Sequence, residues 1–63
     1  MNLKEARIKA GMTLQDLAKL VGVSAAAINR YELGQRSPKI AIAKRLSDVL
    51  GVNWYELVDN KGQ

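Results

Sequence analysis

The segment TLQDLAKLVGVSAAAINRYELG, residues 13–34, predicts two short helices joined by a tight turn. Thr13 and Ser24 are favourable N-caps, because a hydroxyl oxygen can accept a hydrogen bond from a free backbone N–H at the start of a helix. Glycine commonly ends helices because it takes the left-handed backbone conformation without strain. We therefore expect the first helix to end at Gly22 and the second at Gly34.

Both predicted helices are amphipathic, so each should have a buried and an exposed face. In the first helix, the predicted buried residues are Leu17, Ala18 and Val21. In the second helix, the predicted buried residues are Ala27, Ile28 and Tyr31. The predicted exposed residues of the second helix are Ala25, Ala26, Asn29, Arg30 and Leu33.

Two further helices are predicted on either side of this segment. One covers about residues 2–10 and ends at Gly11. Its apolar face consists of Leu3, Ala6 and Ala10. The other begins at Ser37–Pro38, an N-cap followed by a proline in the first turn, and ends at Gly51. Its predicted core residues are Ile40, Ala43, Leu46 and Leu50, with Ile42 and Val49 at the edge of the apolar arc.

A fifth, brief helix is predicted near the C-terminus, with Asn53 as N-cap and Glu56 completing a variant of the capping box. Its apolar residues are Trp54, Leu57 and Val58. We expect a single domain over residues 1–63, with an ordered core over about 2–58 and a frayed tail over 59–63. Such a short chain buries only about 60% of its unfolded surface, so its core is thin.

The positive charge of the chain is concentrated in one region. The net charge is +4, and residues 30–45 hold a single acidic residue, Glu32. The basic residues of this region are Arg30, Arg36, Lys39, Lys44 and Arg45. A polyanion such as DNA would meet this region, and a pair of short helices can present one of them to the major groove. The sequence favours a DNA-binding module, and the alternative is a solvated basic face without a partner.

The residue types also exclude other classes of function. The chain has no cysteine and no histidine, so we expect neither a metal site nor a cofactor, and its core leaves no readable site for a small-molecule ligand. Ser24, Ser37 and Ser47 have no base to activate them, so we expect no enzyme. No apolar run approaches the roughly 20 residues needed to span a bilayer, and the N-terminus is too charged for a signal peptide. We therefore expect no membrane partner and a cytoplasmic location.

Several motifs together resemble a known family. They are GMTLQDLAKLVGVS, AAINRYELGQRSP, a helix ending in LSDVLGV, and NWYEL, in this order. Over residues 3–58 the chain is similar to the lambda-repressor/Cro-like helix-turn-helix domains. The resemblance implies a compact, all-α fold of five helices. It also implies a transcriptional regulator, a repressor rather than an activator, that binds double-stranded DNA sequence-specifically as a dimer on a pseudo-palindromic operator.

In this family the second helix of the motif lies in the major groove, which here assigns base contacts to Ala25, Ala26, Asn29 and Arg30. Arg30 could bind guanine O6 and N7, and Asn29 could bind adenine N6 and N7. The alternatives for Arg30 are a phosphate contact or full solvation. Ala25 and Ala26 replace polar residues that are common in the family. They can touch only a thymine methyl group, so we expect modest direct readout, supplemented by DNA shape.

The resemblance also implies contacts with the DNA backbone. The predicted phosphate contacts are Arg7, Thr13, Gln15, Gln35, Arg36 and Lys39. The family often has glutamine directly after the N-cap, whereas this chain has Leu14 there, and we expect that leucine to be exposed without a role. Lys44 and Arg45 are expected to form a solvated face.

Related repressors pair an arginine of the first helix with a glutamate of the recognition helix, which here implies an ion pair between Arg7 and Glu32. The resemblance also implies a homodimer formed through the fifth helix and its flanks. The candidate interface residues are Val49, Trp54, Tyr55, Leu57 and Val58. Trp54 could instead fill the core. The alternative function is a protein-interaction module, an antitoxin or adaptor that retains the fold, because the alanine-rich helix face could dock a protein.

Overall fold

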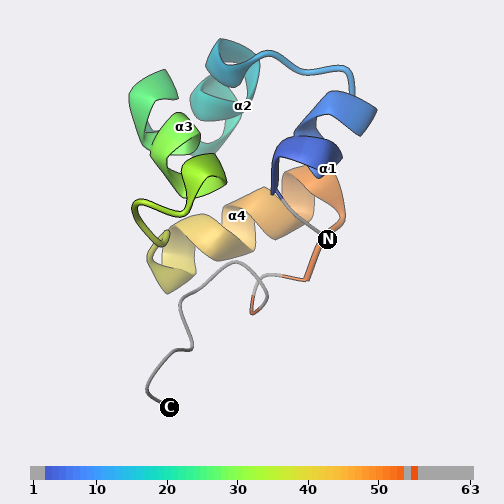
Figure 1. Cartoon of the computed structure of the whole chain (residues 1–63). Helices are drawn as coiled ribbons and strands as arrows, with labels where there is room; N and C mark the ends of the chain where they lie inside the picture. The colour runs from blue at the N-terminus through green and yellow to red at the C-terminus, as the bar shows by residue number, and fades with distance from the viewer. Residues whose placement is uncertain (1–2, 54, 56–63) are drawn as a thin grey trace.

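The computed structural model describes residues 3–53 and residue 55 (Figure 1). Within these residues the chain forms helices and no strand, as an all-α fold requires. The helices are α1 (Leu3–Lys9), α2 (Leu14–Val21), α3 (Ala25–Leu33) and α4 (Ile40–Leu50). The fifth helix was predicted on residues that, apart from Asn53 and Tyr55, lie outside the described part, so it stays a prediction.

Helices α2 and α3 lie against each other, and α4 runs across them (Figure 1). The largest fully buried side chains come from these three helices and are Leu17, Val21, Ile28 and Leu46. Leu3 and Ala6 of α1 are also buried. Burying one such aliphatic side chain contributes about 1.5–3 kcal/mol, so the predicted apolar stripes hold the helices together.

The two caps predicted for α2 and α3 are formed. The side-chain oxygen of Thr13 accepts a hydrogen bond from the backbone N–H of Asp16 at 3.0 Å. The side-chain oxygen of Ser24 accepts one from the backbone N–H of Ala27 at 3.1 Å. Each cap satisfies a backbone donor that has no partner within its own helix.

The predicted start of α4 was wrong. The N-cap residue is Lys39, whose side chain forms no capping hydrogen bond, and the helix begins at Ile40 rather than at Ser37–Pro38. Ile40 was expected in the core but is 54% exposed. Pro38, in the loop before the helix, is buried instead. Because the helix begins at Ile40, residues 37–39 belong to the loop before it, and the buried proline of this loop supplies apolar surface at this end.

The other predictions for the core hold in part. Ala43 and Leu46 are buried as expected, whereas Leu50 is half-buried and Ile42 also packs against the core. Helix α1 ends at Lys9, and Ala10, predicted on its apolar face, is exposed. No helix among the described residues combines the length and the apolar character needed to cross a bilayer.

Candidate nucleic-acid interface

The turn between α2 and α3 depends on one glycine. Gly22 has a φ of +79°, a conformation that L side chains rarely adopt. The backbone N–H groups of Gly22 and Val23 both donate to the carbonyl oxygen of Ala18, at 2.8 and 3.1 Å. This closes α2 within two residues and lets Ser24 start α3 immediately.

The outer face of α3 carries the candidate base contacts. Ile28 on the inner face is fully buried against α2 and α4. The exposed residues of α3 are Ala26, Asn29, Arg30 and Leu33. At the spacing of an α-helix these four lie on one side. Asn29 and Arg30 therefore lie next to each other on the outer face of α3, and both residues are exposed.

Two apolar residues near this face were predicted wrongly. Ala25 was expected to be exposed, yet it is half-buried and packs against the core cluster. Leu14 was expected to be exposed, yet it also packs against the core. Leu14 and Ala25 are the first residues of α2 and α3. The partial burial of Leu14 gives a structural reason for an apolar residue at this position.

The start of α2 holds Thr13 and Gln15, both exposed. The backbone N–H of Thr13 donates to Oδ2 of Asp16 at 3.1 Å, which completes a capping box with the reciprocal bond described above. This backbone N–H, followed by the Thr13 hydroxyl and the charge of Lys19, lowers the pKa of the Asp16 carboxyl from its ordinary value of 3.8. A phosphate at this end would meet the helix dipole and the side chain of Gln15, but also the negative charge of Asp16.

The loop between α3 and α4 contains the remaining predicted phosphate contacts. Gln35, Arg36 and Lys39 are all exposed. The backbone N–H of Gln35 donates to the carbonyl oxygen of Arg30 at 3.0 Å, and Pro38 is buried. The loop backbone is thus anchored at both ends, while its polar and basic side chains remain at the surface next to α3.

Arg7 and Glu32 form an ion pair that is largely removed from solvent. Nε of Arg7 donates to Oε2 of Glu32 at 2.6 Å, and Nη2 donates to Oε1 at 3.4 Å. Nη1 of Arg7 donates to the carbonyl oxygen of Met12 at 2.9 Å. The side chains of the pair are 12% and 4% exposed, respectively. Arg7 therefore connects α1, the α1–α2 loop and α3, and all three of its guanidinium nitrogens are engaged within the chain.

Arg45 has a contact that the sequence did not indicate. It was expected in a solvated face and is exposed, and in addition its Nη1 donates to the carbonyl oxygen of Val21, the last residue of α2, at 3.3 Å. Sequence patterns do not predict this contact, because the two residues are far apart in the chain and the helix crossing brings them together.

The candidate dimer residues are described only in part. Val49 is half-buried and packs against the core of its own chain, while Tyr55 is 55% exposed. Trp54, Leu57 and Val58 lie outside the described residues.

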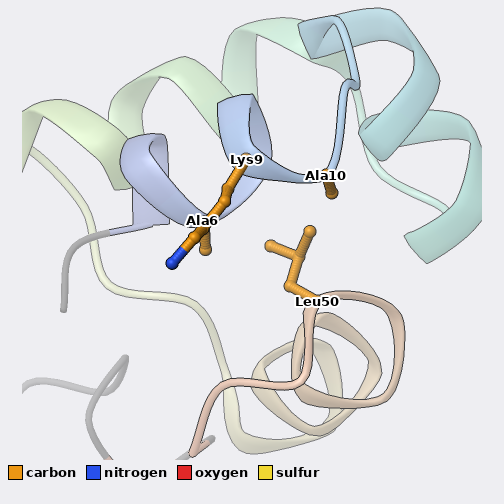
Figure 2. Close-up of a pocket in the computed structure, with 4 residues that line it drawn as sticks. All are labelled: Ala6, Lys9, Ala10 and Leu50. Carbon is orange, nitrogen blue, oxygen red and sulfur yellow. The ribbon is translucent and has the colours of Figure 1, made fainter.

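A small open hollow of about 200 Å³ lies between α1 and the end of α4 (Figure 2). It is lined by Ala6, Lys9, Ala10 and Leu50. None of the residues predicted to contact DNA lines it. Among the described residues, no three His, Cys, Asp or Glu side chains cluster in a way that could hold a metal ion.

Comparison with known proteins supports the reading of the motifs. A family model for the helix-turn-helix matches residues 3–57. A protein of Aeropyrum pernix, provisionally named an HTH-type transcriptional regulatory protein, is 37% identical over 57 residues, which cover 90% of this chain and 17% of that protein. A protein of Methanococcoides burtonii with the same provisional name is 39% identical, again over 90% of this chain and 18% of the relative. The chain thus spans less than a fifth of these two relatives.

A bacterial relative is closer in length. The uncharacterized HTH-type transcriptional regulator YqaF of Bacillus subtilis is 31% identical over 82% of this chain and 68% of that protein. No solved structure gives a significant match. The family match covers most of the chain and includes all four described helices. The chain therefore belongs to the helix-turn-helix family of the Cro/C1 type.

Proposed function

We propose that this chain binds double-stranded DNA sequence-specifically, with α3 in the major groove, and regulates transcription. The observation that carries the proposal is the outer face of α3, where Asn29 and Arg30 are exposed while Ile28 behind them is fully buried. Asn29 can pair with adenine and Arg30 with guanine, and each good bidentate contact is worth about 1–3 kcal/mol of discrimination. The relatives named as transcriptional regulators support the regulatory role.

The proposed backbone contacts surround this face. Arg36 and Lys39 provide cations from the α3–α4 loop, and the start of α2 provides Gln15 with the free backbone N–H groups of the first turn. Arg7 is buried in its ion pair, so it serves mainly to hold α1 and α3 in place. The role is binding rather than catalysis, since the residues at this face include no nucleophile with an activating base.

The proposed assembly is a homodimer that acts as a repressor on a pseudo-palindromic site. Two-fold pairing would place the recognition helices about 34 Å apart, one turn of B-DNA. The residues proposed for the dimer interface are Tyr55 and its neighbours in the sequence. Val49 contributes less, since it is partly buried against the core of its own chain. A small domain with a thin core also gains stability from association.

A salt titration of binding to random duplex DNA and to a pool of selected sites tests the proposal. We expect log K to fall steeply with log salt, by about 0.9 per phosphate neutralised. We also expect an enriched, two-fold-symmetric sequence to bind about a thousandfold tighter than random DNA. Steep salt dependence without enrichment would indicate a non-specific binder.

The second candidate is a protein-interaction module. The observation in its favour is Leu33, which is 61% exposed and lies on the same side of α3 as Ala26. A folded chain that binds no DNA at low salt would exclude the first proposal and leave this one.

A further inference from the structure

The carbonyl oxygen of Val21 stands at the C-terminal end of α2, where the turn leaves it without a backbone partner. The N–H groups of Gly22 and Val23 both donate to the carbonyl oxygen of Ala18, and among the described residues no backbone N–H of the turn or of the start of α3 donates to the Val21 oxygen. Nη1 of Arg45, from α4, donates to the Val21 oxygen at 3.3 Å. A cation at this position also complements the negative end of the helix dipole.

The guanidinium of Arg45 also lies directly beside the turn. A Cβ atom added at Gly22 would be 3.2 Å from Nη1 of Arg45. The next residue along α4, Leu46, is fully buried in the core together with Val21. The α2–α3 turn is therefore held against α4 by a buried apolar contact and, beside it, a charged hydrogen bond.

We propose that Arg45 is a positioning residue that fixes the α2–α3 turn on α4 and so sets where α3 stands relative to the α3–α4 loop. This inference rests on the proposed function. Base contacts by Asn29 and Arg30 and phosphate contacts by Arg36 must form at the same time, which requires a fixed relation between α3 and the loop. Arg45 is exposed, and its Nη1 is bound to the end of α2, so in this proposal the residue acts through the turn rather than as a phosphate ligand.

The salt dependence of binding separates these two roles. A residue that binds a phosphate contributes about 0.9 to the slope of log K against log salt, whereas a positioning residue contributes nothing to it. A positioning residue instead affects the selected site more than random DNA, because only the specific complex needs all contacts together. A cation at a helix C-terminus stabilises the helix by an amount that corresponds to about a twofold to fivefold change in an equilibrium constant.

The experiment compares Arg45→Met with three other variants over a salt series, on the selected site and on random duplex. Arg36→Met shows the effect of losing a phosphate contact, and Lys4→Met on α1 controls for the loss of one charge. For Arg45→Met we expect about twofold to fivefold weaker binding to the selected site, with unchanged binding to random DNA and an unchanged slope. Arg45→Lys should recover most of the loss, because an ammonium can also bind a terminal carbonyl.

Amide hydrogen exchange at Gly22 and Val23 gives a readout that does not depend on DNA. We expect both amides to exchange faster in Arg45→Met than in Lys4→Met, because the turn loses its tie to α4. The proposal is overturned if Arg45→Met lowers the salt slope as Arg36→Met does, if it behaves like Lys4→Met in binding, or if exchange is unchanged. Absence of DNA binding by the wild type would overturn the proposed function, and this proposal with it, while the exchange result would still show whether the turn contact exists.

Discussion

At the scale of single residues, the largest effect that we expect outside the apolar core comes from removing one partner of the ion pair between Arg7 and Glu32. Replacing Arg7 by Met leaves the Glu32 carboxylate with 4% of its side chain exposed and without its cation. Removing one partner of a buried pair costs about 3–5 kcal/mol. We expect Arg7→Met to lower the free energy of unfolding by about 3 kcal/mol, measured by denaturant titration.

The double variant Arg7→Met/Glu32→Leu is the control for this prediction. Replacing both charges by apolar side chains of similar size is often neutral, because the attraction between two buried charges is largely offset by the cost of removing them from water. The double variant should therefore regain most of the stability that Arg7→Met loses. If Arg7→Met alone has the stability and DNA affinity of the wild type, the connecting role of this pair is wrong.

Asp16 predicts a dependence of stability on pH. Its pKa is lowered in the folded chain, first by the hydrogen bond from the Thr13 backbone N–H. A lowered pKa means that the folded state favours the carboxylate, so its contribution is complete above the unfolded value of 3.8 and is lost as pH falls through the lower folded value. Acidification below 3.8 should therefore narrow the stability difference between the wild type and Asp16→Asn. If the stability difference between the two proteins stays constant below pH 3.8, this would contradict the capping box formed by Thr13 and Asp16.

At the scale of helices, the two serines of the predicted caps should behave differently. Ser24 accepts a hydrogen bond at the start of α3, whereas Ser37 precedes α4 by three residues and Lys39 is the N-cap. Losing a capping side chain costs about 1 kcal/mol, and other surface changes stay within about 0.5 kcal/mol. We expect Ser24→Ala to destabilise the chain by about 1 kcal/mol and Ser37→Ala to change little.

Thermal unfolding of the two variants in parallel measures this difference, and each serves as the control for the other. An equal loss of stability in Ser24→Ala and Ser37→Ala would mean that Ser37 caps α4 and that this helix starts earlier than Ile40. No loss in Ser24→Ala would mean that α3 does not depend on its cap.

At the scale of the whole molecule, the proposed homodimer predicts that stability depends on protein concentration. If association is linked to folding, Tm rises with concentration, because a partner that binds only the folded chain stabilises it by mass action. Tyr55→Ala should weaken this dependence, since Tyr55 is a proposed interface residue and is 55% exposed. Scanning calorimetry over a concentration series measures the effect.

Leu20→Ala is the matched control, because Leu20 is also an exposed apolar residue, at 58%, but lies on α2 outside the proposed interface. We expect it to keep the concentration dependence of the wild type. A Tm that is independent of concentration in every variant would exclude the homodimer over that range.

The amino-acid sequence by itself was enough to predict the four described helices, apart from the start of α4, and the local features that bound most of them. Thr13, Ser24 and Gly22 were predicted at the ends of α2 and α3, and each is found there. These features depend on residues within one turn of each other, so a hydroxyl or a glycine at the right spacing is a sufficient signal. The outward placement of Asn29 and Arg30 likewise follows from the period of one helix.

The tertiary structure alone decided which surfaces meet. Leu14 and Ala25 are partly buried against the core and Ile40 is exposed, because burial depends on how the helices cross and on where the loop before α4 runs. The same crossing brings Arg45 to the end of α2, although the two are separated by the whole of α3 and its loop. The spacing of residues along the chain specifies the faces of each helix, but contacts between helices form only when the whole core packs.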